Sequence, residues 1–290
     1  MNSYLIFLMA GLAIGSIYAL SGVGLVLLYR ATGVLNLAYG AIGAAAALIS
    51  WQLGQWGGFA PLCWLAGIVV AGLISLGYGL LISPRLEHRE PVIKAMATLG
   101  VLLILLGLLY SLWPANPRRL DLPSDTIAFN LMGVRLTLTR LLAFIATLVL
   151  TAAITLFLAR TRIGLHMRAL ASHRQLSAIV GIRVIRVEVL AWSISGVMAG
   201  ISGILLGALV RLDAGALTFL VIPALAAAII GRLQSLSLTL VAGLLIGVVE
   251  SLCTLLSTLS PYRSATPFVL AVLAIFWLQR NNRLLFASHQ

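Results

Sequence analysis

The feature that most constrains this chain is a series of long apolar stretches separated by short, mostly basic connections. A spanning helix needs about 20 mainly apolar residues, and only 9% of this chain is charged, against about 25% in soluble domains. The stretches do not alternate between apolar and polar residues, which favours helices over a membrane barrel. We therefore predict an all-α transmembrane bundle with about 8–9 membrane segments, at roughly 4–29, 34–50, 61–82, 95–113, 137–159, 189–210, 216–231, 236–257 and 265–279.

Two of these stretches leave the number of crossings open. The stretches at 34–50 and 216–231 are short, so each can be broken or re-entrant rather than fully spanning. No soluble domain is evident in the sequence. We expect residues 1–290 to form a single transmembrane domain.

The distribution of lysine and arginine predicts the orientation, because cytoplasmic loops are enriched in these residues. With the N-terminus outside and nine alternating segments, thirteen of the 19 lysines and arginines fall on the cytoplasmic side and six outside. The formal net charge of +12 then reflects these loops. It does not indicate nucleic-acid binding, because no basic stretch is interleaved with aromatic residues. We expect a cytoplasmic C-terminus.

One connection, residues 161–188, is too polar to span and too long for a turn. Its first part can form a helix that Gly181 ends, with an imperfect apolar face made of Leu165, Leu170, Leu176 and Ile179 together with Ala169 and Ala178. A short basic helix with small residues on one face can dock on another protein. It can equally lie on anionic lipid, and the pattern alone leaves both interpretations open.

Several polar side chains fall within or beside apolar segments, where they are costly and are functional candidates. Glu250 is an acidic residue predicted deep in a helix, and it can line a path or make a structural hydrogen bond. Asn36 and Tyr39 stand where a broken backbone would face a cavity, and they can instead bond helix to helix. The full candidate set for a translocation path is Ser16, Tyr18, Ser21, Asn36, Tyr39, Thr98 and Glu250.

Small residues recur four positions apart in several segments, a spacing that lets helix backbones approach closely in lipid. The pairs are Gly11 and Gly15, Gly196 and Gly200, Gly203 and Gly207, and Gly243 and Gly247. We interpret them as packing positions within the chain or at a dimer interface.

The sequence shows neither a metal site nor a nucleotide site. The four histidines, His88, His166, His173 and His289, lie in predicted loops or the tail and form no metal cluster. No G-x-x-x-x-G-K-[ST] motif occurs. The groups that an intramembrane enzyme would need, such as a Ser–His pair or paired aspartates, do not converge in any predicted span. We therefore expect neither a cofactor in this chain nor an enzymatic activity of its own.

Three blocks of sequence resemble one known family. The segment "TRIGLHMRALASHRQLSAIVGIRVIRVEVLAWSISGVMAGISGILLG", the opening "GLAIGSIYALSGVGLVLLYRATGVLNLAYGAIGA" and the late block "LVAGLLIGVVESL" are similar, in family order, to the high-affinity branched-chain amino acid permease subunits of ABC importers. The first block carries A-(x)2-GI at Ala178, Gly181 and Ile182, the end of the pattern G-(x)6-A-(x)2-GI that is associated with permease subunits of ABC importers, and Ala171 stands where that pattern has its first glycine.

The resemblance implies a function for the basic connection. It would be an ATPase-coupling loop, with Gly164, Arg168, Ala169, Ala178, Gly181 and Ile182 as the matching residues. It also implies a second permease subunit, which is usually a different chain, two cytoplasmic ATPase subunits that bind ATP and Mg²⁺, and a periplasmic solute-binding protein. The location would be the bacterial inner membrane, and the cargo a small polar solute such as an amino acid or a related carboxylate or amide.

The sequence departs from the family pattern at a few positions. Gly231 is followed by Arg232 where the family often has a second glycine, and Tyr39 stands where a histidine or another polar residue is frequent. These departures bear on the substrate more than on the fold. A self-sufficient secondary transporter or channel remains the alternative, although such a protein needs no docking loop.

Overall fold

The computed structural model describes residues 2–87, 89–114, 118–120, 128–131, 134–219, 221–255 and 260–286, and this part of the chain is almost entirely helical. The elements are α1 (Asn2–Thr32), α2 (Tyr39–Gln55), α3 (Ala60–Leu81), η1 (Pro84–Leu86), α4 (Pro91–Leu112), β1 (Ala128–Leu131), β2 (Val134–Thr137), α5 (Leu138–Arg160), α6 (Arg162–Ser172), α7 (Arg174–Ile179), α8 (Val184–Leu209), α9 (Ala214–Phe219), α10 (Val221–Ile230), α11 (Leu236–Cys253), η3 (Ser260–Ala265) and α12 (Thr266–Phe286).

The predicted transmembrane bundle is confirmed. Within the described residues, six helices are long and apolar enough to cross a bilayer, namely those in α1, α3, α4, α5, α8 and α11. Their outer faces carry large exposed aliphatic side chains, such as Leu103, Ile104 and Leu108 on α4. Such faces suit lipid rather than water, so the chain is a multi-pass membrane protein.

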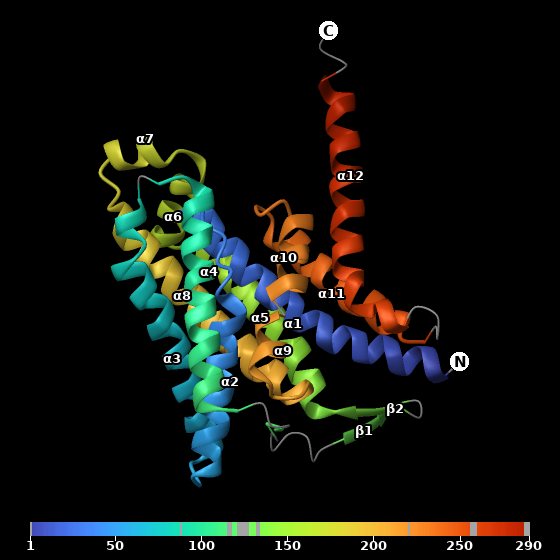
Figure 1. The fold of residues 1–290 in the computed structure, drawn as a ribbon. Helices are drawn as coiled ribbons and strands as arrows, with labels where there is room; N and C mark the ends of the chain where they lie inside the picture. The colour runs from blue at the N-terminus through green and yellow to red at the C-terminus, as the bar shows by residue number, and fades with distance from the viewer. Residues whose placement is uncertain are drawn as a thin grey trace.

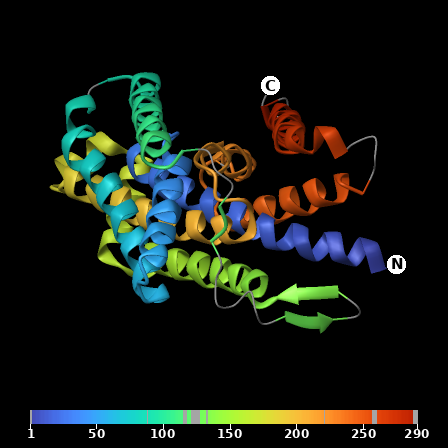
Figure 2. The same cartoon turned by 60° about the horizontal axis from the view of Figure 1, so that its bottom comes forward.

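Helix α1 forms the centre of the bundle. Its most apolar stretch is 89% buried, against 11% for that of α4, which places α4 at the periphery. It packs against α5, α8, α10 and α11, and Figure 2 shows it running through the middle of the molecule with α11 alongside. The remaining helices are therefore organised around the first one.

Backbones approach most closely where the glycine pairs occur. A Cβ on Gly247 would lie 2.2 Å from the Cα of Gly15 in α1, and a Cβ on Gly203 would lie 2.2 Å from the carbonyl oxygen of Gly43 in α2. The interpretation of these glycines as packing positions within the chain is thus confirmed for α1 with α11 and for α2 with α8.

Several helix boundaries differ from the predicted segments by four residues or more, among them the end of α2 at Gln55, the end of α12 at Phe286 and the two helix starts that follow. The second helix begins at Tyr39 rather than near residue 34, because residues 33–38 are non-helical. Helix α8 begins at Val184, inside the predicted basic connection. Charged residues in its first turns hid this start, since a charge at the aqueous end of a spanning helix costs little. The stretch predicted at 216–231 contains two short helices, α9 and α10.

The ends of the bundle carry different elements. In Figure 1, α6 and α7 lie at the upper end, and the end of α12 points to the same side. The N-terminal end of α1 and the hairpin formed by β1 and β2 lie lower. The hairpin is antiparallel, with Ala128 opposite Thr137. The turn between α10 and α11 holds Arg232 and Leu233, both with φ of +55°. The arginine that replaces the family's second glycine therefore adopts a backbone conformation that favours glycine.

Candidate functional site

The connection between α1 and α2 is a stretch of irregular backbone inside the bundle. Gly33 ends α1 with φ of +69°, and its N–H donates to the carbonyl of Tyr29 at 2.7 Å. The side chains of Val34 and Asn36 that follow are buried. Buried backbone groups that are outside a helix need hydrogen-bond partners from elsewhere in the protein, so this connection needs support from its neighbours.

Thr98 of α4 supplies that support. Its hydroxyl accepts a hydrogen bond from the N–H of Leu37 at 3.1 Å. The same hydroxyl can donate to the carbonyl of Ala95 at 2.7 Å or to that of Leu35 at 3.1 Å. Thr98 is fully buried. It therefore fixes the connection to a helix that is otherwise peripheral.

Tyr39 begins α2 and faces a small cavity of about 20 Å³ that Ser21 of α1 and Ser202 of α8 also line. Its hydroxyl packs against Gly24, where a Cβ would lie 2.5 Å from the hydroxyl oxygen. Within the described residues, neither this hydroxyl nor the amide of Asn36 meets the geometry of a hydrogen bond, although the hydroxyls of Ser21 and Ser202 lie close enough to interact with that of Tyr39. Buried polar groups without partners are rare, so these two residues mark the polar interior of the bundle.

Two further path candidates, Tyr18 and Glu250, form a pair between α1 and α11. The Tyr18 hydroxyl donates to a carboxylate oxygen of Glu250 at 2.9 Å. The hydrogen-bonding interpretation of Glu250 thus has a specific partner. This pair does not share the Tyr39 cavity.

Ser16 has a local role. Its hydroxyl donates to the carbonyl of Ala13 at 2.7 Å, and its own carbonyl accepts from Thr147 of α5 at 3.0 Å. The structure thus brings Ser21 and Tyr39 into one cavity and places Thr98 and Asn36 at the neighbouring break. Sequence reasoning missed Ser202, whose only signal was a small polar residue beside Gly203 on a glycine-rich face.

A pair of conservative variants tests these assignments. Tyr39→Phe should leave the free energy of unfolding within about 0.5 kcal/mol of the parent, because no hydrogen bond is lost. Tyr18→Phe should lower it by about 1–2 kcal/mol, because the Glu250 carboxylate loses its donor. Thermal unfolding in detergent measures both. Equal losses in the two variants would contradict the difference in partners.

The basic connection forms two helices rather than the single helix that the pattern predicts. Thr161 caps α6 by accepting from the N–H of Gly164 at 3.0 Å. His173 then adopts an extended conformation, with φ of −150°, and separates α6 from α7. The predicted single apolar face is wrong, because its residues are divided between α6 and α7 and because Leu165 and Leu170 differ in exposure within α6. Leu170 is buried with Met167, whereas Leu165, Leu176 and Ile179 are exposed.

The residues that match the family's coupling pattern are two glycines with structural roles and four other residues that differ in exposure. Gly164 is buried, and a Cβ there would lie 2.5 Å from the Cα of Leu158, so it lets α6 pack against the end of α5. Gly181 has φ of +91° and turns the chain after α7. Arg168 and Ala178 are exposed, while Ala169 and Ile182 are half-buried.

Exposed aliphatic side chains gather where α7 ends, at residues 176–180, which we call the tip of this connection. Ile179 and Val180 are each 81% exposed, and Leu176 is 58% exposed. Beside this tip lies an open cavity of about 670 Å³ that Ala169, Val180 and Gly181 line, together with Ile163, Leu165, His166, Ile182, Arg183, Arg186, Val187 and Leu190. The tip and the cavity together form an apolar surface bordered by arginines.

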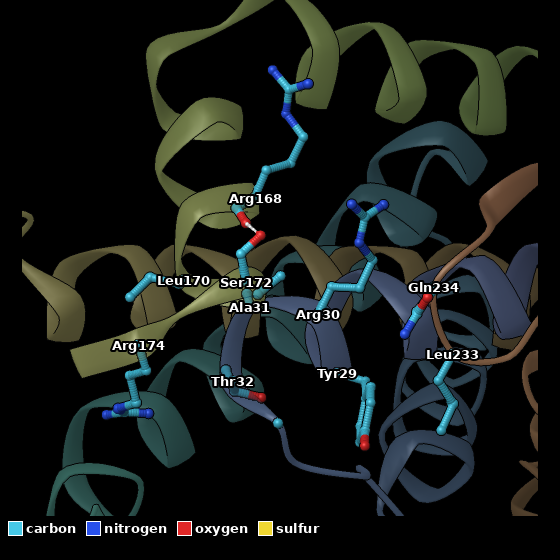
Figure 3. A pocket seen from close by; sticks show the side chains of 12 residues that line it. Tyr29, Arg30, Ala31, Thr32, Arg168, Leu170, Ser172, Arg174, Leu233 and Gln234 are labelled. Carbon is cyan, nitrogen blue, oxygen red and sulfur yellow. Dashed lines mark hydrogen bonds between the residues drawn. The ribbon is translucent and has the colours of Figure 1, made fainter. Parts of the chain in front are cut away.

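A second open cavity, of about 740 Å³, lies between the end of α1, helix α6 and the turn before α11. Figure 3 shows that the guanidinium groups of Arg30 and Arg168 extend from it in the same direction, whereas Arg174 points away from them. Among the described residues, no acidic side chain lines this cavity. Neither Arg30 nor Arg168 makes an ion pair with a described residue, so the cavity presents uncompensated positive charge.

Metal binding finds no support in the described part of the chain, where no group of three His, Cys, Asp or Glu side chains is placed to hold an ion. Of the four histidines, His88 and His289 lie outside the described residues.

Comparison with known proteins gives a consistent result over nearly the whole length. Residues 7–278 match the family described as branched-chain amino acid transport system / permease component. The high-affinity branched-chain amino acid transport system permease protein BraD of Pseudomonas aeruginosa is 27% identical over 263 residues, covering 86% of this chain and 85% of that protein. The corresponding LivH protein of Escherichia coli K12 is 27% identical over 288 residues, covering 91% and 90%.

A probable branched-chain amino acid transport permease protein LivH from Methanocaldococcus jannaschii is 28% identical over 244 residues, covering 82% of this chain and 78% of that protein. Among solved structures, PsaBC from Streptococcus pneumoniae in complex with Fab is similar, with a TM-score of 0.52 and 13% identity over 92% of this chain and 90% of that one. At this identity the likeness concerns the fold alone.

Proposed function

Because the chain belongs to the branched-chain amino acid transport system / permease component family, we propose that it is the membrane-spanning permease subunit of an ABC importer. It forms part of the translocation path for a small polar solute, which is an amino acid or a related small carboxylate or amide. Two ATPase subunits bind ATP and Mg²⁺ and supply the energy. A second permease subunit and a periplasmic binding protein complete the assembly.

The observation that carries this proposal is the exposed tip of the basic connection. Ile179 and Val180 stand 81% exposed at a glycine turn, beside a cavity bordered by Arg183 and Arg186. Apolar groups exposed in this way indicate a protein partner. Arg30 and Arg168 form no ion pair with a described residue, and their charges favour a partner that presents acidic groups. A groove on a cytoplasmic ATPase with an apolar floor and acidic rim fits both properties.

The arrangement of the ends supports the orientation that the charge distribution predicts. The end of α12 points to the same side as α6 and α7 in Figure 1. If the connection docks on a cytoplasmic ATPase, the C-terminus is cytoplasmic too, and the membrane is the bacterial inner membrane.

For the path, we place Ser21, Tyr39 and Ser202 at a closed constriction. Their cavity of about 20 Å³ has room for about one water molecule, so it is too small for an amino acid. Transport then requires a second state in which this cavity opens. Binding and hydrolysis of ATP in the partners shift the population toward that state through the docked connection.

The experiment is co-purification with the ATPase. The parent chain, co-expressed with ABC ATPase subunits of the same organism, should bring them down. Val180→Asp should reduce the recovered ATPase about tenfold or more, because it places a carboxylate in an apolar contact, and 1.4 kcal/mol already corresponds to tenfold. Arg168→Glu should weaken binding as well, through charge reversal opposite an acidic rim.

The matched control is Arg211→Glu, the reversal of another exposed charge, just beyond the opposite end of α8. Helix α8 has 26 residues and is therefore about 39 Å long, so this control should leave ATPase recovery unchanged. Full recovery with both Val180→Asp and Arg168→Glu would contradict docking through this connection. Uptake by the chain alone, without any ATPase, would instead favour a self-sufficient transporter.

A further inference from the structure

Arg174, the first residue of α7, lies between two carboxylates that are far apart in the sequence. Its Nη2 is 2.9 Å from a carboxylate oxygen of Glu87, and its Nη1 pairs with Glu188. The Glu188 side chain is 7% exposed, and those of Arg174 and Glu87 are 32% and 31% exposed. The family pattern of the coupling connection does not include this arginine.

The three residues belong to three separate parts of the bundle. Glu87 follows η1 in the connection between α3 and α4, whereas Glu188 lies in the second turn of α8. Lys94, near the start of α4, interacts electrostatically with all three side chains. The charge cluster therefore links α7 to the α3–α4 connection and also to the start of α8.

Helix α7 has few other attachments. It has six residues, and an extended His173 and a turn at Gly181 bound it on either side. Its aliphatic residues Leu176 and Ile179 point into solvent, and Ser177 bonds only within the segment, to the carbonyl of His173 at 2.9 Å. Among the described residues, the Arg174 ion pairs are thus the polar link between α7 and the rest of the bundle.

We propose that Arg174 is a positioning residue that transmits movement of α7 to α8 and to the α3–α4 connection. The inference rests on the proposed function, since it assigns the route by which a docked ATPase moves the bundle. A planar guanidinium that holds two carboxylates fixes direction as well as distance. Without it, Glu87 and Glu188 repel each other and α7 can move independently of the helices.

A purely structural role must be separated from transmission, because Arg174→Gln leaves the buried Glu188 carboxylate without its partner and is destabilising by itself. The decisive variant is therefore Arg174→Gln with Glu188→Gln. It removes the orphaned buried charge and should restore the thermal unfolding temperature close to that of the parent. The control is Arg160→Gln, which removes an exposed arginine at the end of α5 that has no ion pair within the described residues and lines neither of the two open cavities.

The readout is the conformational response of the assembled importer to ATP. Spin labels on cysteines introduced at Val197 in α8 and Leu245 in α11, with Cys63 and Cys253 replaced by alanine, report the separation of these lipid-facing positions. In the parent and in Arg160→Gln, ATP and Mg²⁺ should shift the distance distribution. In the double variant the ATPase should still co-purify, and the shifted population should fall about fivefold or more.

An unchanged ATP-driven shift in the double variant, with the ATPase bound, would overturn the inference while leaving the proposed function intact. The inference would also fail if, in Arg174→Gln and in the double variant, the loss of ATP response were proportional to the loss of unfolding temperature, because a purely structural role predicts that proportionality. Failure of the parent chain to bind any ATPase would instead overturn the proposed function itself.

Discussion

Replacing Gly247 with alanine should lower the free energy of unfolding by about 3 kcal/mol, because overpacking against rigid atoms costs about 1–3 kcal/mol or more. The added Cβ would lie 2.2 Å from the Cα and 2.3 Å from the backbone nitrogen of Gly15. A flexible side chain could move aside, but two helix backbones must separate as a whole. Thermal unfolding of the purified chain in detergent should show a marked decrease in midpoint.

The matched control for this variant is Gly107→Ala on the peripheral helix α4, where nothing lies within 4 Å of the added Cβ. This change should be neutral or slightly stabilising, since alanine is the better helix former by about 1 kcal/mol. If both alanine variants behaved alike, the close approach of α1 and α11 would not exist in the protein.

Thr98→Val should be the second most damaging single change. Valine keeps the shape but removes the hydroxyl that accepts from Leu37, so a backbone N–H is left without its partner, and a lost partner costs about 1–3 kcal/mol when the group is buried. Because this N–H is partly buried, we expect the middle of that range. The measurement is again thermal unfolding, supplemented by proteolysis of the connection at residues 33–38.

Thr98→Ser serves as the control because it keeps the oxygen. It should retain most of the stability and the protease resistance of the parent. Destabilisation by serine equal to that by valine would show that the methyl group, and not the hydrogen bond, holds the connection in place.

The fold could be predicted largely from the sequence because membrane burial imposes one strong pattern. Apolar length alone located the spanning helices, and the glycine spacing identified the faces of α1, α8 and α11 that pack closely. Helix starts were less well predicted. The first turns of α8 carry Arg186 and Glu188, and local polarity cannot distinguish a loop from the aqueous end of a helix.

The candidate sites were predictable only in part because their residues come together across long sequence separations. The polar candidates on α1 and α2 could be identified singly, but the cavity also needs Ser202 of α8. Likewise, Glu87 and Arg174 are 87 positions apart, and no local pattern pairs them. The break at His173 was missed because the residues on both sides of it are helical and continue one helical pattern.

The central place of α1 has a consequence for how the chain is made. Its glycine face packs against α11, and Ser251 donates to the carbonyl of Phe7, 244 positions earlier. At synthesis rates of about 5–20 residues per second, the first helix enters the membrane roughly 12–50 s before its main partner exists. During that interval its bare backbone groove must be shielded by lipid or by the insertion machinery, which makes the order of insertion itself a condition for reaching the native bundle.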